Sequence, residues 1–228
     1  MIFGSYQLTE RIELNLPRGA LVVEKISENI VRITKIINGA STSKLISTQT
    51  DSFITLKAIP PIGGSLSTNC IYATLPEPVT LTQGTRLQYD LKLPVDLGIF
   101  IGGDLVDVVP LGKVKYALYG PPDIGDICRY SDLSVINSYN EYIARAKVIF
   151  KTLSNVKTEI SRLVIPIKEA SVYLTEENEM YFSDIEVTVL SPLHVEIRVG
   201  VDTSYILLGK LISLFKGSGA FYVMKHGA

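Results

Sequence analysis

Residues 185–199 read Ile-Glu-Val-Thr-Val-Leu-Ser-Pro-Leu-His-Val-Glu-Ile-Arg-Val, and this stretch decides the fold class. Apolar and polar residues alternate on both sides of Ser-Pro-Leu, which predicts two half-buried strands joined by a turn. If the turn centres on Pro192, Glu186 lies opposite Arg198 and Thr188 lies opposite Glu196. The same register puts the apolar residues of both strands on one face, so the pattern and the register support each other.

Similar hairpins are expected elsewhere in the chain. Residues 20–37 form two β-rich runs around Ser-Glu-Asn, and residues 97–109 form two more around Gly-Gly-Asp. Residues 143–153 alternate small or apolar residues with Arg and Lys, as a half-buried strand does. Turn signals recur about every 8–12 residues, which is typical of sandwiches and barrels. We therefore predict an all-β protein built of one or two antiparallel β-sandwiches.

The composition excludes several classes of protein. Hydrophobic residues make up 46% of the 228 residues and charged residues 20%, which excludes intrinsic disorder. The formal net charge is -1, so the chain has no overall basic field that would attract nucleic acid. No apolar run reaches the length of about 18 residues that a membrane-spanning helix needs. We expect neither a nucleic-acid partner nor a membrane span.

The organisation along the chain suggests two sheet regions. Residues 1–120 are expected to form a β-sandwich domain, residues 121–140 an irregular connecting loop, and residues 141–228 a second sheet region. The last region could equally be part of one continuous sandwich. Near the C-terminus, Leu207, Leu211, Leu214 and Phe215 follow at helical spacing after Thr-Ser, and a glycine stands where a C-cap belongs. This predicts one short amphipathic helix.

The cellular location is inferred from the N-terminus and the cysteines. Residues 1–11 have neither the cationic region nor the apolar run of a signal peptide. We therefore expect a cytoplasmic protein, in which Cys70 and Cys128 are thiols and act as small buried hydrophobes.

The best candidate site is the segment 120–140, where chemically active side chains gather without a regular period. They are Asp123, Asp126, Arg129, Tyr130 and Asp132. Such carboxylates could bind a hard cation, or could bind a sugar together with the arginine and the tyrosine face. The alternative is a structural crossover held by two prolines and an arginine–aspartate ion pair. The spacing matches no known metal loop, so we predict neither a metal site nor a cofactor, and the catalytic residues stay unknown.

Asp107 is a second candidate for ligand binding. Strand alternation places it on one face with Leu105 and Val109, so it interrupts an apolar stripe. A buried carboxylate must be paired, hydrogen-bonded or protonated. The alternative is an ordinary solvent-facing residue on an edge strand.

Three stretches carry a resemblance to a known family: residues 93–102 (Leu-Pro-Val-Asp-Leu-Gly-Ile-Phe-Ile-Gly), residues 115–122 (Lys-Tyr-Ala-Leu-Tyr-Gly-Pro-Pro) and residues 125–130 (Gly-Asp-Ile-Cys-Arg-Tyr). They are similar to an uncharacterised archaeal family, domain of unknown function 432. The resemblance implies an archaeal source. It implies no activity, so no catalytic residue can be carried over.

Two functions follow from these observations. The first is a non-enzymatic binding or interaction module that self-associates, because the chain is apolar, has few charges and has no catalytic motif. Its partners would be further copies of the same chain and a carbohydrate or another small ligand. The alternative is a metal-assisted or acid/base hydrolase that cleaves a carbohydrate or a phosphate ester through the aspartate-rich loop.

Overall fold

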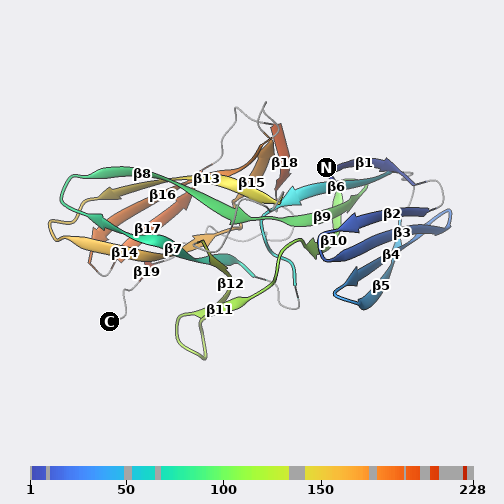
Figure 1. Ribbon diagram of the computed structural model, residues 1–228, viewed down its shortest axis with the longest axis horizontal. Helices are drawn as coiled ribbons and strands as arrows, with labels where there is room; N and C mark the ends of the chain where they lie inside the picture. The colour runs from blue at the N-terminus through green and yellow to red at the C-terminus, as the bar shows by residue number, and fades with distance from the viewer. Residues whose placement is uncertain are drawn as a thin grey trace.

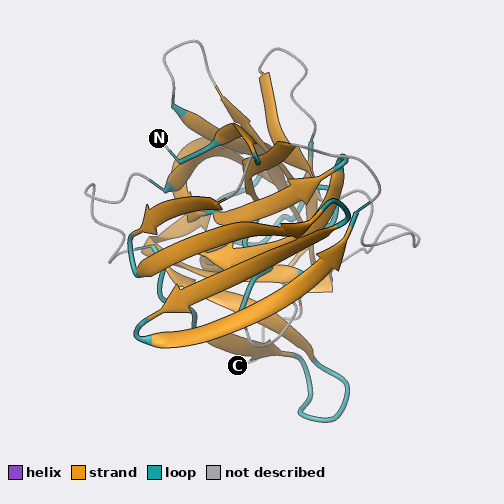
Figure 2. Ribbon diagram, turned by 90° about the vertical axis from the view of Figure 1, so that its right-hand side faces the viewer, coloured by secondary structure: helices purple, strands orange, loops and turns teal. Residues whose placement is uncertain are grey.

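The structure is a computed structural model that describes residues 2–8, 11–48, 53–64, 68–133, 142–174, 179–192, 194–200, 206–210 and 223–224. All the secondary structure in these residues is β-strand, as Figure 2 shows, so the predicted all-β class is confirmed. The strands are β1 (Gly4–Gln7), β2 (Arg11–Leu16), β3 (Gly19–Ser27), β4 (Ile30–Ile37), β5 (Ala40–Ser47), β6 (Phe53–Ile59), β7 (Cys70–Leu81), β8 (Arg86–Pro94), β9 (Asp96–Ile101), β10 (Asp104–Pro110), β11 (Tyr116–Tyr119), β12 (Asp126–Asp132), β13 (Ile143–Thr152), β14 (Thr158–Pro166), β15 (Ser171–Leu174), β16 (Met180–Ser191), β17 (His194–Val199), β18 (Ile206–Lys210) and β19 (Val223–Met224).

The described strands form four sheets. Their orders are β1-β6-β9-β10, β2-β3-β4-β5, β11-β12-β7-β14 and β18-β15-β16-β13-β8, with β17 on β16 and β19 on β17. Figure 1 shows the first two sheets at one end of the long axis and β8, β13 and β16 with β7 and β14 at the other end. Buried apolar side chains from both ends belong to one continuous core.

Strands before and after the segment 121–140 pair with each other. β8 pairs with β13 and β7 pairs with β14, both antiparallel. Along β13 the predicted alternation is present, since Ala144, Ala146, Val148 and Phe150 are all buried and their neighbours are not. The regions before and after the segment 121–140 therefore contribute strands to the same sheets.

The hairpin that opened the sequence analysis has the predicted register. Glu186 lies opposite Arg198 and Thr188 lies opposite Glu196. The ionic partners differ from the strand partners, because Glu186 pairs with Lys151 at 2.6 Å and Arg198 pairs with Glu196 at 2.7 Å. The apolar face therefore set the register without a Glu186–Arg198 ion pair.

The turns follow the expected chemistry. Between β4 and β5, Asn38 (φ 51°) and Gly39 (φ 82°) adopt the left-handed conformation that a two-residue type I′ hairpin turn requires. Between β9 and β10, Gly102 (φ 62°) and Gly103 (φ 87°) do the same. The predicted hairpins over residues 20–37 and 97–109 are confirmed as β3–β4 and β9–β10.

Two predictions about irregular and helical structure need correction. Residues 126–132 of the expected loop are strand β12, which lies between β11 and β7 and so is hydrogen-bonded on both sides. Residues 206–210, the start of the expected C-terminal helix, are strand β18, which pairs with β15. Pairing with an existing sheet outweighs the local helical spacing there. Residues 211–217 of that predicted helix lie outside the described residues.

The sheets are not purely antiparallel. β12 pairs with β7 in parallel, and β13 pairs with β16 in parallel. Both pairs join strands that are far apart in sequence, since parallel strands need a long crossover connection. Hairpin signals in the sequence report only antiparallel neighbours, so they missed these two pairs.

Candidate functional site

The most deeply buried charges in the described fold are Asp96 and Arg129. Asp96 begins β9 and is 0% exposed, while Arg129 lies in β12 and is 1% exposed. Arg129 Nη2 lies 3.5 Å from Asp96 Oδ1. Arginine and aspartate are almost never fully buried unless they are paired. The pair therefore ties β12 to the sheet that contains β9.

Gly63 completes this buried arrangement. Its N–H donates a hydrogen bond to Asp96 Oδ2 at 2.6 Å, and its carbonyl accepts one from Arg129 Nη1 at 2.5 Å. A Cβ atom at this position would lie 2.7 Å from Val108 Cγ1 and 2.9 Å from Asp96 Oδ2, which is too close for any real side chain. Glycine fits here because a side chain would collide with Val108 and with the Asp96 carboxylate that the Gly63 N–H binds.

The buried carboxyl group has a perturbed acidity. Burial raises the pKa of Asp96 from its ordinary 3.8 to about 7. The Arg129 guanidinium and the backbone N–H groups of Gly63 and Leu111 act in the opposite direction. Desolvation dominates because the group is fully removed from water. Asp96 therefore changes its charge near neutral pH.

A disulfide bond joins Cys70 to Cys128 beside this pair. Cys70 begins β7, and Cys128 directly precedes Arg129 in β12, so the bond crosses between two parallel neighbours. The prediction that these cysteines are thiols is therefore wrong. The interpretation of both as buried is right, since each is 0% exposed. Their sequence separation of 58 residues concealed the pairing, because a sequence alone does not show whether two distant cysteines come within bonding distance.

A cleft lies directly outside Gly63. It consists of two adjoining hollows of about 270 and 300 Å³, which share Lys35 of β4, Gly64 and Val108 of β10 as lining residues. Asp107 lines the first hollow and Thr42 of β5 lines the second. The cleft thus separates the inner face of the β2–β5 sheet from β10. Its floor is the glycine backbone that Asp96 and Arg129 hold in place.

The polar chemistry of the cleft comes from Lys35 and Asp107. Lys35 Nζ donates to Asp107 Oδ1 at 2.8 Å and to the carbonyl of Val108 at 3.4 Å. Asp107 Oδ1 also accepts a bond from the Val108 N–H at 2.8 Å. Asp107 Oδ2 is buried and has no hydrogen-bond partner among the described residues. Such an acceptor is a place for a bound hydroxyl group or water.

A β-bulge explains why Asp107 faces the cleft. The pairing of β10 with β9 shifts register between Leu105 and Asp107. A bulge twists the strand and redirects its side chains, and bulges are common next to functional sites. The bulge also breaks the expected alternation, since Leu105 lies opposite Phe100 whereas Asp107 lies opposite Ile99. Asp107 therefore shares its face with Val109 but not with Leu105, and it is a paired, half-buried carboxylate.

The other aspartates of the predicted site lie elsewhere. Asp123 is exposed in the turn between β11 and β12, and Asp126 is exposed at the start of β12. Both lie at the end of the β11–β12 hairpin, which projects from the body in Figure 1. Asp132 is half-buried at the opposite end of β12. The structure therefore spreads these three carboxylates along one hairpin and does not join them to Asp107.

The two remaining candidates point to opposite faces of β12. Arg129 is turned inward to Asp96 and reaches the cleft only through Gly63. Tyr130 is half-buried and stacks on Tyr72, with ring centroids 6.2 Å apart, and Lys115 Nζ lies 5.9 Å from its ring centroid. Tyr130 is thus part of the packing between β12 and β7.

The sequence analysis missed Lys35, Asp96 and Gly63 as members of the site. Asp96 carries a detectable signal, because it is a single charge within the apolar run 95–101 and all residues of β9 are buried. Lys35 carries a similar signal, because it is the one charged residue on the strand face that it shares with Val31, Ile33 and Ile37.

Two further features of the described residues concern metal binding and membrane crossing. Among the residues that the structure describes, no three His, Cys, Asp or Glu side chains gather closely enough to hold a metal ion. No helix in the described part has the length and apolarity that crossing a membrane requires.

Comparison with known proteins agrees with the resemblance seen in the sequence. No curated protein and no solved structure matches the chain. The model of a family described as "Protein of unknown function (DUF432)" matches residues 2–204, which include β1 to β17, the buried ion pair, the disulfide and the cleft. With nearly the whole chain matched, this protein belongs to the DUF432 family.

Proposed function

We propose that this protein is a non-enzymatic binding module, and that its cleft between β4, β10 and Gly63–Gly64 takes a small polyhydroxylated ligand such as a carbohydrate. The observation that carries the proposal is the Lys35–Asp107 pair with its unpartnered Oδ2 atom. A ligand hydroxyl can donate to this carboxylate oxygen, and a neighbouring hydroxyl can accept from the ammonium group. Paired donors and acceptors of this kind suit neighbouring hydroxyl groups of a sugar.

The size and rigidity of the cleft support the same function. Each hollow is near the lower end of the range for small-molecule sites, about 300–1,000 Å³. Gly64 has a φ of +133°, and a Cβ at this position would collide with the hydroxyl group of Tyr116. The floor is therefore fixed by close backbone packing, which reduces the entropy lost when a ligand binds.

The positions of the aspartates favour binding over the hydrolase alternative. Glycosidic chemistry needs two carboxyl groups on either side of one bond, about 5–10 Å apart. Asp107 is bonded to Lys35 in the cleft, whereas Asp123 and Asp126 lie at the end of a projecting hairpin. The hydrolase alternative would need the carboxylates of these two places to act on one substrate.

A binding experiment tests the proposal. Saturation-transfer NMR and calorimetry with a panel of neutral hexoses and pentoses are expected to show binding that Asp107→Asn or Lys35→Met weakens at least tenfold. Asp123→Asn is the matched control, since it removes an exposed carboxylate and should leave the affinity unchanged. Absence of binding by every sugar, or equal effects of Asp107→Asn and Asp123→Asn, would contradict the proposal. Release of sugar from aryl glycosides that depends on Asp107 would favour the hydrolase.

The cellular location is also a proposal. We propose that the protein is cytoplasmic. Disulfides are rare in the cytoplasm of most organisms but frequent inside hyperthermophilic archaea. The Cys70–Cys128 bond is compatible with a cytoplasmic location in such a host. We likewise propose that residues 141–228 continue the sandwich formed by residues 1–120, since β13 pairs with β8 and β14 pairs with β7.

A further inference from the structure

Strand β5 (Ala40–Ser47) is an open edge of the β2–β5 sheet. It pairs with β4 along its whole length without a register shift, and no described strand pairs with its other side. Every residue of the strand except Ile46 is exposed. Its outer backbone N–H and C=O groups are therefore free to pair with another extended chain.

Three other edge strands of the described sheets, β2, β10 and β14, carry protection that β5 lacks. β2 presents Arg11 and Glu13, and β14 contains a bulge and ends in Pro166. Carbonyl groups of β10 accept hydrogen bonds from Lys35 and Lys44. Bulges, prolines and charges are the devices by which proteins prevent edge pairing.

The residues of β5 themselves invite pairing. The strand reads Ala-Ser-Thr-Ser-Lys-Leu-Ile-Ser, with no proline and one charge. That charge is turned away from the edge, because Lys44 Nζ donates to the carbonyl of Val106 in β10 at 2.6 Å. Leu45 is 62% exposed on the outer face. An unprotected, nearly uncharged edge with an exposed leucine is unusual unless another strand covers it.

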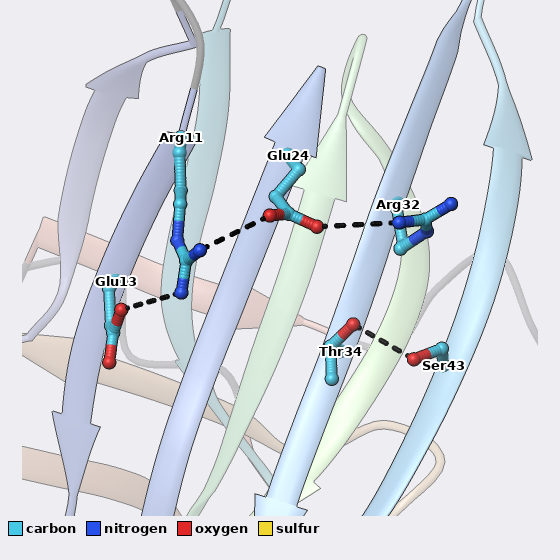
Figure 3. A network of polar contacts seen from close by, with 6 residues as sticks. All are labelled: Arg11, Glu13, Glu24, Arg32, Thr34 and Ser43. Atoms are coloured by element: carbon cyan, nitrogen blue, oxygen red, sulfur yellow. Dashed lines mark hydrogen bonds and ion pairs between the residues drawn. The ribbon is translucent and has the colours of Figure 1, made fainter. Parts of the chain in front are cut away.

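We propose that β5 pairs antiparallel with β5 of a second copy of this chain, which joins two β2–β5 sheets into one continuous sheet. A second copy fits this edge because its partner strand then has the same neutral Ser/Thr side chains. Figure 3 shows that the charged groups of the outer face, Arg11, Glu13, Glu24 and Arg32, are paired among themselves on β2, β3 and β4. They neither block the approach of a copy at β5 nor require an oppositely charged partner.

An axis near the middle of β5 pairs the most residues, and charge selects between the two central positions, Ser43 and Lys44. A two-fold axis perpendicular to the sheet must pass through a residue position, so that outward-facing side chains lie beside outward-facing ones. An axis at Lys44 would put two ammonium groups directly opposite, which is unfavourable. An axis at Ser43 pairs residues 40–46 of both copies and puts Ser41 opposite Leu45 of the partner subunit.

Ser43 is well placed for this position. Its hydroxyl group lies 2.9 Å from that of Thr34 on the outer face, as Figure 3 shows. Two such serines on the axis would extend this hydroxyl pair into a short chain of hydrogen bonds across both copies. Small side chains at the axis also allow the two backbones to approach to the strand spacing of about 4.8 Å.

Cysteine cross-linking tests the interface and its register. The described residues contain no free cysteine, so an introduced thiol reports on its own position. Under mild oxidation, Ser43→Cys is expected to form a covalent dimer, since directly opposite residues lie about 4.5–5.5 Å apart at Cα. Ser47→Cys is the matched control on the same strand, and its two copies would lie roughly 27 Å apart. At least tenfold more cross-linked dimer is expected from Ser43→Cys.

Light scattering after size-exclusion chromatography provides the independent measurement. The wild-type chain is expected at twice its mass of 25.1 kDa. Ser43→Lys puts two like charges on the axis and should shift the protein to the monomer, whereas Ser47→Lys should leave the dimer intact. A wild-type monomer at all concentrations, a dimer that Ser43→Lys does not weaken, or equal cross-linking of both cysteine variants would overturn the proposal.

Discussion

The β2–β5 sheet and the strands around Arg129 differ in how they are assembled. The sheet is a meander in which each strand pairs with the next one along the chain. Around Arg129, by contrast, β12 pairs with β7 in parallel, and the Asp96–Arg129 pair and the Cys70–Cys128 bond join distant segments. Local pairing therefore builds the β2–β5 sheet, whereas the buried polar centre depends on long-range contacts.

The energetic consequences should differ in the same way. Buried charges without partners are costly, while surface ion pairs contribute little. Substitutions around Arg129 should therefore have large effects on the free energy of unfolding. Substitutions of charged residues on the outer face of β2–β5 should have small effects. Substitutions in both regions test this contrast, and the substitution of Arg129 should change the free energy of unfolding most.

Removal of the buried guanidinium is expected to have the greatest effect. Arg129→Met should lower the free energy of unfolding by about 3–5 kcal/mol at pH 8, because Asp96 then remains buried without its counter-ion. The loss should be smaller at pH 5, where the carboxyl group is protonated. Urea denaturation at both pH values measures this. Arg162→Met is the control, since Arg162 is exposed on β14, and a similar loss in that variant would contradict the prediction.

Loss of the disulfide should come next. Cys70→Ala combined with Cys128→Ala is expected to lower the free energy of unfolding by about 2–4 kcal/mol, because the unfolded chain gains the freedom of a loop of 58 residues. Thermal unfolding under non-reducing conditions measures the difference. With reductant in the buffer, the disulfide of the wild-type protein is reduced once the protein unfolds. Its melting temperature should then approach that of the variant. An unchanged melting temperature in the double variant would show that the bond contributes no stability.

The raised pKa of Asp96 predicts a pH dependence of stability. Its pKa is about 7 in the folded protein and 3.8 ordinarily, so between these values the folded state binds a proton that the unfolded state has released. The stabilisation from this group is complete below about pH 4 and is lost as the pH rises towards 7, by at most about 1.4 kcal/mol per unit. Above pH 7 the contribution is constant. Denaturant unfolding from pH 4.5 to 8 should show this slope.

Asp96→Asn provides the control for that slope. The amide has nearly the same shape but does not titrate in this range, so the variant should lose the fall in stability between pH 4 and 7. If the variant keeps the full slope, another group is responsible and the assignment to Asp96 is wrong.

The smallest effect is expected on the outer face of β2–β5. Glu24 lies 3.5 Å from Arg11 and 3.7 Å from Arg32, and its side chain is 27% exposed. Glu24→Gln should lower the free energy of unfolding by no more than about 0.5 kcal/mol, and 0.5 M salt should reduce the difference further. Thermal unfolding at two salt concentrations measures it. A loss above about 1 kcal/mol would remove the contrast with Arg129.

The sequence determined the parts of this fold in which a side-chain pattern and a turn lie close together. The alternation in residues 185–199 predicted the pairing of Glu186 with Arg198, because a one-residue slip would expose the whole apolar face. Gly102-Gly103 predicted the β9–β10 hairpin because these residues accept a positive φ. Asp107 was found as a charge within an apolar run, although the bulge beside it removes the expected alternation with Leu105.

Tertiary structure alone decided the polar centre and the cleft. Whether Cys128 reaches Cys70, and which cation meets Asp96, depends on the parallel placement of β12 beside β7, which no local pattern encodes. The strand at residues 206–210 is a similar case, since an available sheet edge replaced the helix that the local spacing favoured. Local sequence fixes which face of a strand is apolar, but long-range packing fixes which polar groups meet once water has been excluded.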